Sequence, residues 1–271
     1  MRGSWAHRWF DPLRLAAYAV CLFVALPILV VLASSMTAAN YVTFPPQGLS
    51  VRWYGAVLRD AHLLEAVRVS VTVAVATAVL AVGLGFGATV GLERYRFPGR
   101  ALAVSFVMAP LALPTIVLAL GMLFFMSVIG LVGSASGLVM GHLVVALPYA
   151  VRALSASLGG VNRDIERSAA VLGAPPAVVA WKVTLPLMRP GVIAAFIFAF
   201  LVSFNNVSIS LFIAGPTTQT LPLTIFRLAQ DVQTPTLAAL GALVMCLTTV
   251  VVVVLEKSVG LYGMLERQRY A

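Results

Sequence analysis

Long apolar stretches that are almost free of charged residues dominate the chain. They lie at 15–36, 69–92, 102–128, 137–155, 191–213 and 232–255. Each is close to the ~20 residues that an α-helix needs to cross the hydrocarbon core of a bilayer. The third and fourth share one uncharged stretch, 101–151, which a turn rich in glycine and serine near 130–137 divides. The pattern predicts six transmembrane helices.

The amino-acid composition, taken with this pattern, indicates the fold class. Apolar residues make up 61% of the chain and charged residues only 10%, with a mean hydropathy of +1.01. A soluble domain carries about 25% charged residues, so water cannot be the main solvent of this surface. A β-barrel would show alternating segments of about ten residues. The predicted fold is therefore all-α, a polytopic membrane helical bundle with six transmembrane helices.

Basic residues lie between the apolar runs and predict an orientation. The net charge of +9 would point to nucleic acid in a soluble protein, but here it flanks spans and no nucleic-acid partner is expected. Fourteen Lys and Arg residues fall on the side of both termini, and four fall on the other side: Arg52, Arg59, Arg68 and Arg227. The positive-inside rule puts both termini in the cytoplasm, with the bundle surrounded by membrane lipid. The first run is too long for a signal peptide and is expected to be a retained helix.

Three parts are expected along the chain. Residues 1–66 hold a cytoplasmic segment, the first transmembrane helix and an amphipathic segment at 51–66. That segment is interpreted as a helix on the outer surface, because Trp53 and Tyr54 suit a membrane interface. Residues 67–258 form a five-helix core with a cytoplasmic loop at 157–190, and 259–271 form a cytoplasmic tail.

Few residues have the chemistry of a catalytic or metal site. His7, His62 and His142 are isolated, and Cys21 and Cys246 lie inside apolar runs. No metal site is predicted, and His142 is interpreted as a packed or hydrogen-bonded residue. Glycines recur within the second span, where small residues let helices approach closely: Gly83, Gly85, Gly87 and Gly91. They lack the Lys-Ser/Thr pair of a phosphate-binding loop.

The cytoplasmic loop has its own pattern. An apolar stripe predicts one helix, and its members recur at spacings of 3, 4, 4 and 3: Leu158, Val161, Ile165, Ala169 and Leu172. Gly173 and Pro175-Pro176 end this helix, and a second short helix is expected at 177–183. Connections between bundle helices usually have 2–8 residues. The loop therefore indicates docking to a cytoplasmic partner, with a loop that packs on its own bundle as the alternative.

The same loop resembles the cytoplasmic motif of ABC importer permeases, which reads EAA, three residues, Gly, nine residues, Ile-x-Leu-Pro. Gly173 is followed by nine residues and then Val183-Thr184-Leu185-Pro186. Arg167 and Ser168 stand where the family usually has Glu and Ala, and Glu166 lies one position early. Stretches at 44–54, 93–100, 110–121, 146–152 and 203–226 also look like the polyamine branch of this family, above all the second permease subunit of spermidine/putrescine importers.

The resemblance implies a type I importer fold in the bacterial inner membrane and a set of partners. These are a second permease subunit, two ATPase subunits and an extracytoplasmic substrate-binding protein. No cofactor is expected in this chain, since ATP and Mg belong to the ATPase subunits and the chain has no phosphate-binding loop of its own; it is not expected to be an enzyme. The residues that the resemblance assigns to ATPase coupling are Ile165, Glu166, Arg167, Ala169, Ala170, Gly173, Val183, Leu185 and Pro186.

A polar cluster in the fifth span is the candidate substrate path: Ser203, Asn205, Asn206 and Ser208. Polar groups inside a membrane usually face the bundle interior, so either substrate contact or hydrogen bonding between helices explains them. Many relatives are more acidic here, and two neutral amides weaken the case for a polyvalent cation. A polyamine, 2-aminoethylphosphonate, an opine or another small organic solute all stay open.

Three other function classes compete. A secondary transporter driven by an ion gradient usually carries charged residues within its spans, and the uncharged stretches hold none. A membrane-embedded enzyme needs a cluster of His, Asp, Glu or Cys, and a channel does not need a structured docking loop. The sequence favours the importer permease.

Overall fold

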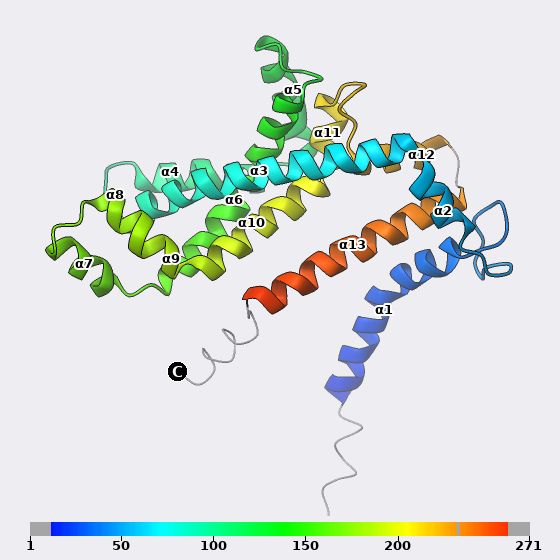
Figure 1. The fold of residues 1–271 in the computed structure, drawn as a ribbon, viewed down its shortest axis with the longest axis horizontal. Helices are drawn as coiled ribbons and strands as arrows, with labels where there is room; N and C mark the ends of the chain where they lie inside the picture. Colours follow the sequence, from blue (N-terminus) through cyan, green and yellow to red (C-terminus); the bar gives the residue numbers. More distant parts are fainter. Residues whose placement is uncertain (1–11, 232–233, 260–271) are drawn as a thin grey trace, which may run out of the picture. The chain divides into compact units, whose positions relative to one another are not determined.

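A computed structural model describes residues 12–231 and 234–259, and every regular element in it is a helix (Figure 1). Four helices are long and apolar enough to cross a membrane, and the number reaches six when each of two bent helix pairs counts as one span. This confirms the predicted all-α membrane bundle. His7 and all but the first residue of the predicted tail at 259–271 lie outside the described residues.

The chain divides into two compact units, which are described separately. The first comprises residues 1–61 and 227–247. Its helix α1 (Pro12–Ser35) leads into a loop that folds back on itself, with Ser50 N–H donating to the Met36 carbonyl over 2.8 Å. Helix α2 (Arg52–Arg59) follows, and α12 (Leu221–Asp231) and α13 (Pro235–Val259) contribute their parts to this unit.

The predicted single helix at 51–66 is wrong. Helix α2 stops at Arg59, Asp60 adopts an extended backbone, and the next helix already begins at Ala61. Trp53 donates from its indole N–H to the Thr37 carbonyl over 2.9 Å, and the Tyr54 hydroxyl lies 2.6 Å from that of Ser35. Both aromatic side chains therefore brace the loop after α1.

The second unit comprises residues 62–226 and 248–271, and three long helices build its core. Helix α3 (Ala61–Arg94), helix α6 (Ala135–Gly159) and helix α10 (Arg189–Phe204) contribute mostly alanines to the contact. Helices α6 and α10 run side by side (Figure 1). Small side chains let these backbones approach closely, which is how helices associate where lipid removes the hydrophobic driving force.

The third span is not one straight helix. Helix α4 (Arg100–Met108) and the 3₁₀ turn η2 (Ala109–Leu111) meet α5 (Thr115–Val128) at a bend of 104°. Pro114 precedes α5, and a proline cannot continue the preceding helix because it lacks an N–H. The predicted run at 102–128 is therefore a broken segment. The turn expected near 130–137 is confirmed, with Gly130 and Gly133 at φ of 69° and 80°.

We expect Gly191→Ala to disrupt the contact between α6 and α10. A β-carbon at Gly191 would lie 2.1 Å from Cβ of Ser157, so one of the helices has to move. Overpacking of this kind costs about 1–3 kcal/mol. Thermal unfolding of the purified protein in detergent should show a lower melting temperature, and adding Ser157→Gly should restore much of it. Gly87→Ala is the matched control, because nothing lies within 4 Å of its β-carbon position.

Candidate functional site

The cytoplasmic loop folds as a chain of short helices. Helix α7 (Arg163–Val171) starts at Asn162, whose side-chain oxygen accepts from the Asp164 N–H over 2.9 Å. Gly173 follows at φ +88°, a conformation that favours glycine. Helix α8 (Pro176–Val179), the π-helical turn η3 (Ala180–Thr184) and helix α9 (Leu185–Leu187) then lead to α10.

The predicted boundaries of the first loop helix are wrong. Leu158 belongs to α6, and Val161 precedes α7; both pack into the core of α3, α6 and α10. Only Ile165, Ala169 and Leu172 of the predicted stripe lie on or beside α7, and of these Ile165 and Leu172 are exposed. The apolar spacing continued across a turn and concealed the start of a new helix.

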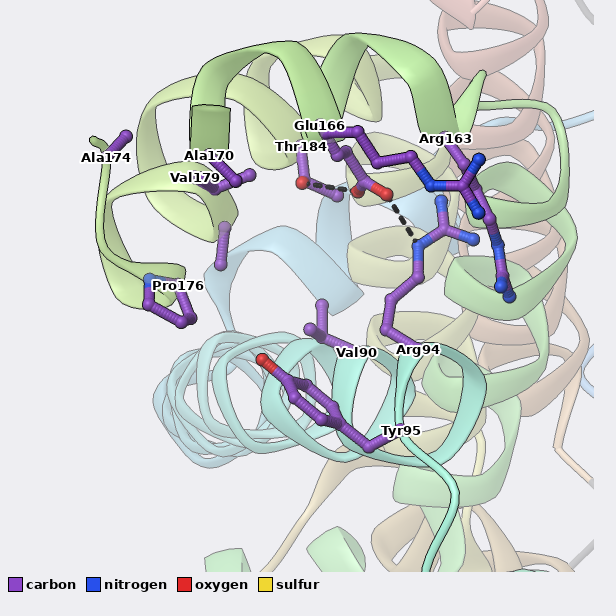
Figure 2. A pocket seen from close by; sticks show the side chains of 12 residues that line it. Val90, Arg94, Tyr95, Arg163, Glu166, Ala170, Ala174, Pro176, Val179 and Thr184 are labelled. Carbon is purple, nitrogen blue, oxygen red and sulfur yellow. Dashed lines mark hydrogen bonds and ion pairs between the residues drawn. The ribbon is translucent and has the colours of Figure 1, made fainter. Parts of the chain in front are cut away.

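Three side chains attach α7 to the rest of the unit. They are Arg94, Glu166 and Thr184, and we call them the Glu166 cluster. Arg94 Nε lies 2.9 Å from one carboxylate oxygen of Glu166 (Figure 2). The two groups form an ion pair, but their alignment is not that of a hydrogen bond. The Thr184 hydroxyl donates to the other carboxylate oxygen over 2.6 Å. The Arg94 and Glu166 side chains are only 15% and 14% exposed. Arg94 also donates to the carbonyls of Leu158 and Val161.

A cavity of about 400 Å³ opens beside the Glu166 cluster. Val90 and Tyr95 line it from the α3 end, and Ala170 and Val179 line it from the loop (Figure 2). Arg163 lines it too and donates to the Glu93 carbonyl at the end of α3 over 3.0 Å. The loop is thus tied to α3 at several points.

The predicted coupling residues divide into inward and outward groups. Glu166 points inward to Arg94, whereas Arg167 points outward and pairs with Asp164 at 3.2 Å, with both side chains more than 70% exposed. The remaining members range from half-buried to exposed: Ile165, Ala169, Ala170, Gly173, Val183, Leu185 and Pro186.

Sequence reasoning missed Arg94, Thr184 and an apolar tip. Val171 and Leu172, which we call the loop tip, are each 87% exposed, and Trp181 is 62% exposed. The signal for the loop tip was present as two adjacent apolar residues before Gly173. Nothing in the sequence pairs Arg94 with Glu166, since they are distant along the chain.

The predicted span at 191–213 is interrupted at its polar residues. Helix α10 ends at Phe204 and helix α11 (Val207–Ile213) begins three residues later, leaving Asn205 and Asn206, the helix break, between them. The Asn206 side-chain oxygen accepts from the Ile209 N–H over 2.9 Å and so caps α11. The Asn205 amide donates to the Leu201 carbonyl over 3.0 Å while its side chain stays exposed.

The four residues of the polar cluster have different surroundings. Ser203 is buried and hydrogen-bonded to His142, which supports contact between helices. Asn206 serves its own helix, Ser208 is half-buried, and Asn205 alone of the four is exposed. His142 is a hydrogen-bonded core residue, as predicted. In the described part of the chain, no three His, Cys, Asp or Glu residues gather as a metal site.

Comparison with known proteins gives the family. Residues 81–259, well over half of the chain, match the family model described as binding-protein-dependent transport system inner membrane component. The chain is 28% identical over 235 residues to the spermidine/putrescine transport system permease protein PotC of Escherichia coli (strain K12), covering 87% of this chain and 89% of PotC. It is 31% identical over 230 residues to the putrescine transport system permease protein PotI of the same organism, covering 82% of each.

Solved structures agree on the fold. A bacterial ABC transporter involved in the import of the acidic polysaccharide alginate matches with a TM-score of 0.70 at 17% identity, over 97% of this chain and 99% of that one. An amino acid ABC transporter matches with a TM-score of 0.56 at 14% identity, over 79% and 98%. The chain therefore belongs to the binding-protein-dependent transport system inner membrane components, as a multi-pass permease subunit of an ABC importer.

Proposed function

We propose that this chain is one of two different permease subunits in an ATP-driven importer of a small organic solute. An extracytoplasmic binding protein delivers the solute. Two separate ATPase subunits dock on the cytoplasmic side, and the cytoplasmic loop of this chain binds one of them. Both termini lie on the ATPase side, as the distribution of Lys and Arg indicates. Polyamines are the first solutes to test, since PotC and PotI are named for spermidine and putrescine transport.

The main observation behind the proposal is that the cytoplasmic loop is exposed at its tip and attached to α3 at its base. The loop tip places two fully apolar side chains in solvent, and an exposed apolar patch of this kind marks a protein contact. At its base, the Glu166 cluster joins α7 to the end of α3. A displacement of the loop tip by the ATPase dimer is therefore transmitted to the transmembrane helices, and alternating access follows from that movement.

Helix α3 is long enough to carry such a movement across the membrane. It has 34 residues, or about 50 Å at 1.5 Å per residue, and the hydrocarbon core is only about 30 Å thick. One end must project beyond the membrane. Arg94 at its C-terminal end meets Glu166 of the loop, so the loop is attached directly to the cytoplasmic end of a continuous transmembrane helix.

The solute path is proposed at the helix break. Asn205 presents an uncharged amide whose oxygen is not used by the hydrogen bond to Leu201. Such an amide accepts from an ammonium group and also donates to a carboxylate or a phosphonate. The site can therefore hydrogen-bond amino-bearing solutes of either polyamine or amino-acid-like character, and it offers a polyamine no negative charge.

Assembly and uptake test this function directly. The chain, expressed with its partner permease, ATPase and binding protein, should purify as one complex and import labelled putrescine or spermidine at the expense of ATP. Gly173→Asp adds strain of about 1–2 kcal/mol at a positive φ and bulk next to the loop tip, so we expect it to release the ATPase. Gly130→Asp is the matched control, with φ of 69° and open space, in the turn between α5 and α6. Uptake by this chain alone, without ATPase, would overturn the proposal.

We expect Glu166→Ala to separate ATP hydrolysis from uptake. The change leaves Arg94 and Thr184 without their carboxylate, at a cost of about 1–3 kcal/mol for an unpaired buried group. Hydrolysis by the purified complex should continue but lose its stimulation by loaded binding protein. Asp164→Ala serves as control, because its ion pair with Arg167 is highly exposed and such pairs are worth about 0–1 kcal/mol. Equal behaviour of the two variants would contradict the role of the Glu166 cluster.

The two asparagines of the helix break should differ. Asn206→Ala removes a helix cap and should lower the melting temperature, since such a cap contributes about 1 kcal/mol; Asn206→Asp keeps the acceptor and should not. Asn205→Ala should leave the melting temperature unchanged and raise the KM for uptake, because the side chain is exposed. An unchanged KM in Asn205→Ala would remove this residue from the path.

A further inference from the structure

A buried histidine connects the two halves of the interrupted helix. His142 lies in α6 and is 1% exposed. Its Nδ1 is 2.8 Å from the hydroxyl of Ser203 in the last turn of α10, and its Nε2 is 3.1 Å from the hydroxyl of Ser210 in α11. Both serines are buried. One side chain thus joins three helices beside the helix break.

The donors and acceptors define the order in which these hydrogen bonds run. The Ser210 hydroxyl donates to the backbone carbonyl of Asn206 over 3.1 Å, so its oxygen accepts from His142. A neutral imidazole has one donor and one acceptor. We therefore assign the hydrogen to Nε2, and Nδ1 then accepts from the Ser203 hydroxyl. The hydrogen bonds run from Ser203 through His142 and Ser210 to the carbonyl of Asn206, and each strengthens the next.

A neighbouring glycine brings the histidine within reach. A β-carbon at Gly141 would lie 2.8 Å from the side chains of both Ile209 and Ile213. The missing side chain lets α6 approach α11 closely. The ring of His142 is rigid, so its two nitrogens hold Ser203 and Ser210 at a fixed separation. That separation sets the distance between the end of α10 and the start of α11.

We propose that His142 is a positioning residue of the solute path, whose ring holds the helix break in the conformation that exposes Asn205. The inference rests on the proposed function and names the residue that sets the geometry of that site. His142 touches no solute, because it is buried. It acts through Ser210 on the carbonyl of Asn206, while the side chain of Asn206 caps α11.

Hydrogen exchange on the assembled complex tests the connection without any solute. His142→Phe keeps a ring and removes both hydrogen bonds, so amides of residues 205–213 should exchange about tenfold faster. Ser203→Ala and Ser210→Ala should each accelerate the same amides. Combining Ser203→Ala with His142→Phe should add nothing, because both break one chain of hydrogen bonds. Thr89→Val, a change at a buried polar residue of α3, is the control and should leave these amides unchanged.

Two further measurements separate positioning from packing. His142→Gln keeps a donor and an acceptor and should exchange more slowly than His142→Phe; the reverse order would mean that the ring only fills space. In uptake of labelled putrescine, His142→Phe should raise KM about fivefold or more, with basal ATP hydrolysis unchanged. Unchanged exchange, or faster exchange with an unchanged KM, would overturn the proposal. A parent complex that imports no polyamine would instead count against the proposed solute, while the exchange data still decide the role of His142.

Discussion

Hydrocarbon offers no partner for a free N–H or carbonyl, so each interruption of a helix in this bundle has to be closed locally. At two of its interruptions the described chain does this with short polar side chains. At the helix break, Asn206 caps α11 and Asn205 bonds back to α10. At the start of α6, the Ser134 hydroxyl accepts from the Gly137 N–H over 3.0 Å. Each of these three side chains pairs one backbone group beside an interruption.

The same constraint makes the polar residues of the fifth span serve two purposes. A continuous helix would have needed neither asparagine, and the residues that close the break are also those next to its exposed surface. Ser203 and Asn206 are occupied by structural hydrogen bonds, whereas Asn205 keeps an exposed side chain. The proposed path would in this way have one accessible polar group while the neighbouring polar groups are hydrogen-bonded within the protein.

Hydropathy predicted the spans because it is summed over about twenty residues. Two non-helical residues within such a window change the sum very little. For the same reason it could not detect the break at Asn205 and Asn206, where the sequence remains apolar on both sides. The loop shows a related limit. Leu158 and Val161 kept the helical spacing of the residues after Asn162, although a turn separates them. The inward orientation of Glu166 depends on Arg94, which comes from another helix and which the sequence indicated only as a topological charge.

Helix α6 takes part in both the loop base and the helix break. Its C-terminal end supplies the Leu158 carbonyl to Arg94, and its N-terminal half supplies His142 to Ser203 and Ser210. The separation of sixteen positions between His142 and Leu158 corresponds to about 24 Å of helix. Buried ion pairs contribute little net stability, but breaking one is costly, so the Arg94–Glu166 pair favours a single position of the loop against the helices. Under the proposed function, a movement of the loop that carries α6 with it would reach His142 and, through Ser203 and Ser210, the helix break.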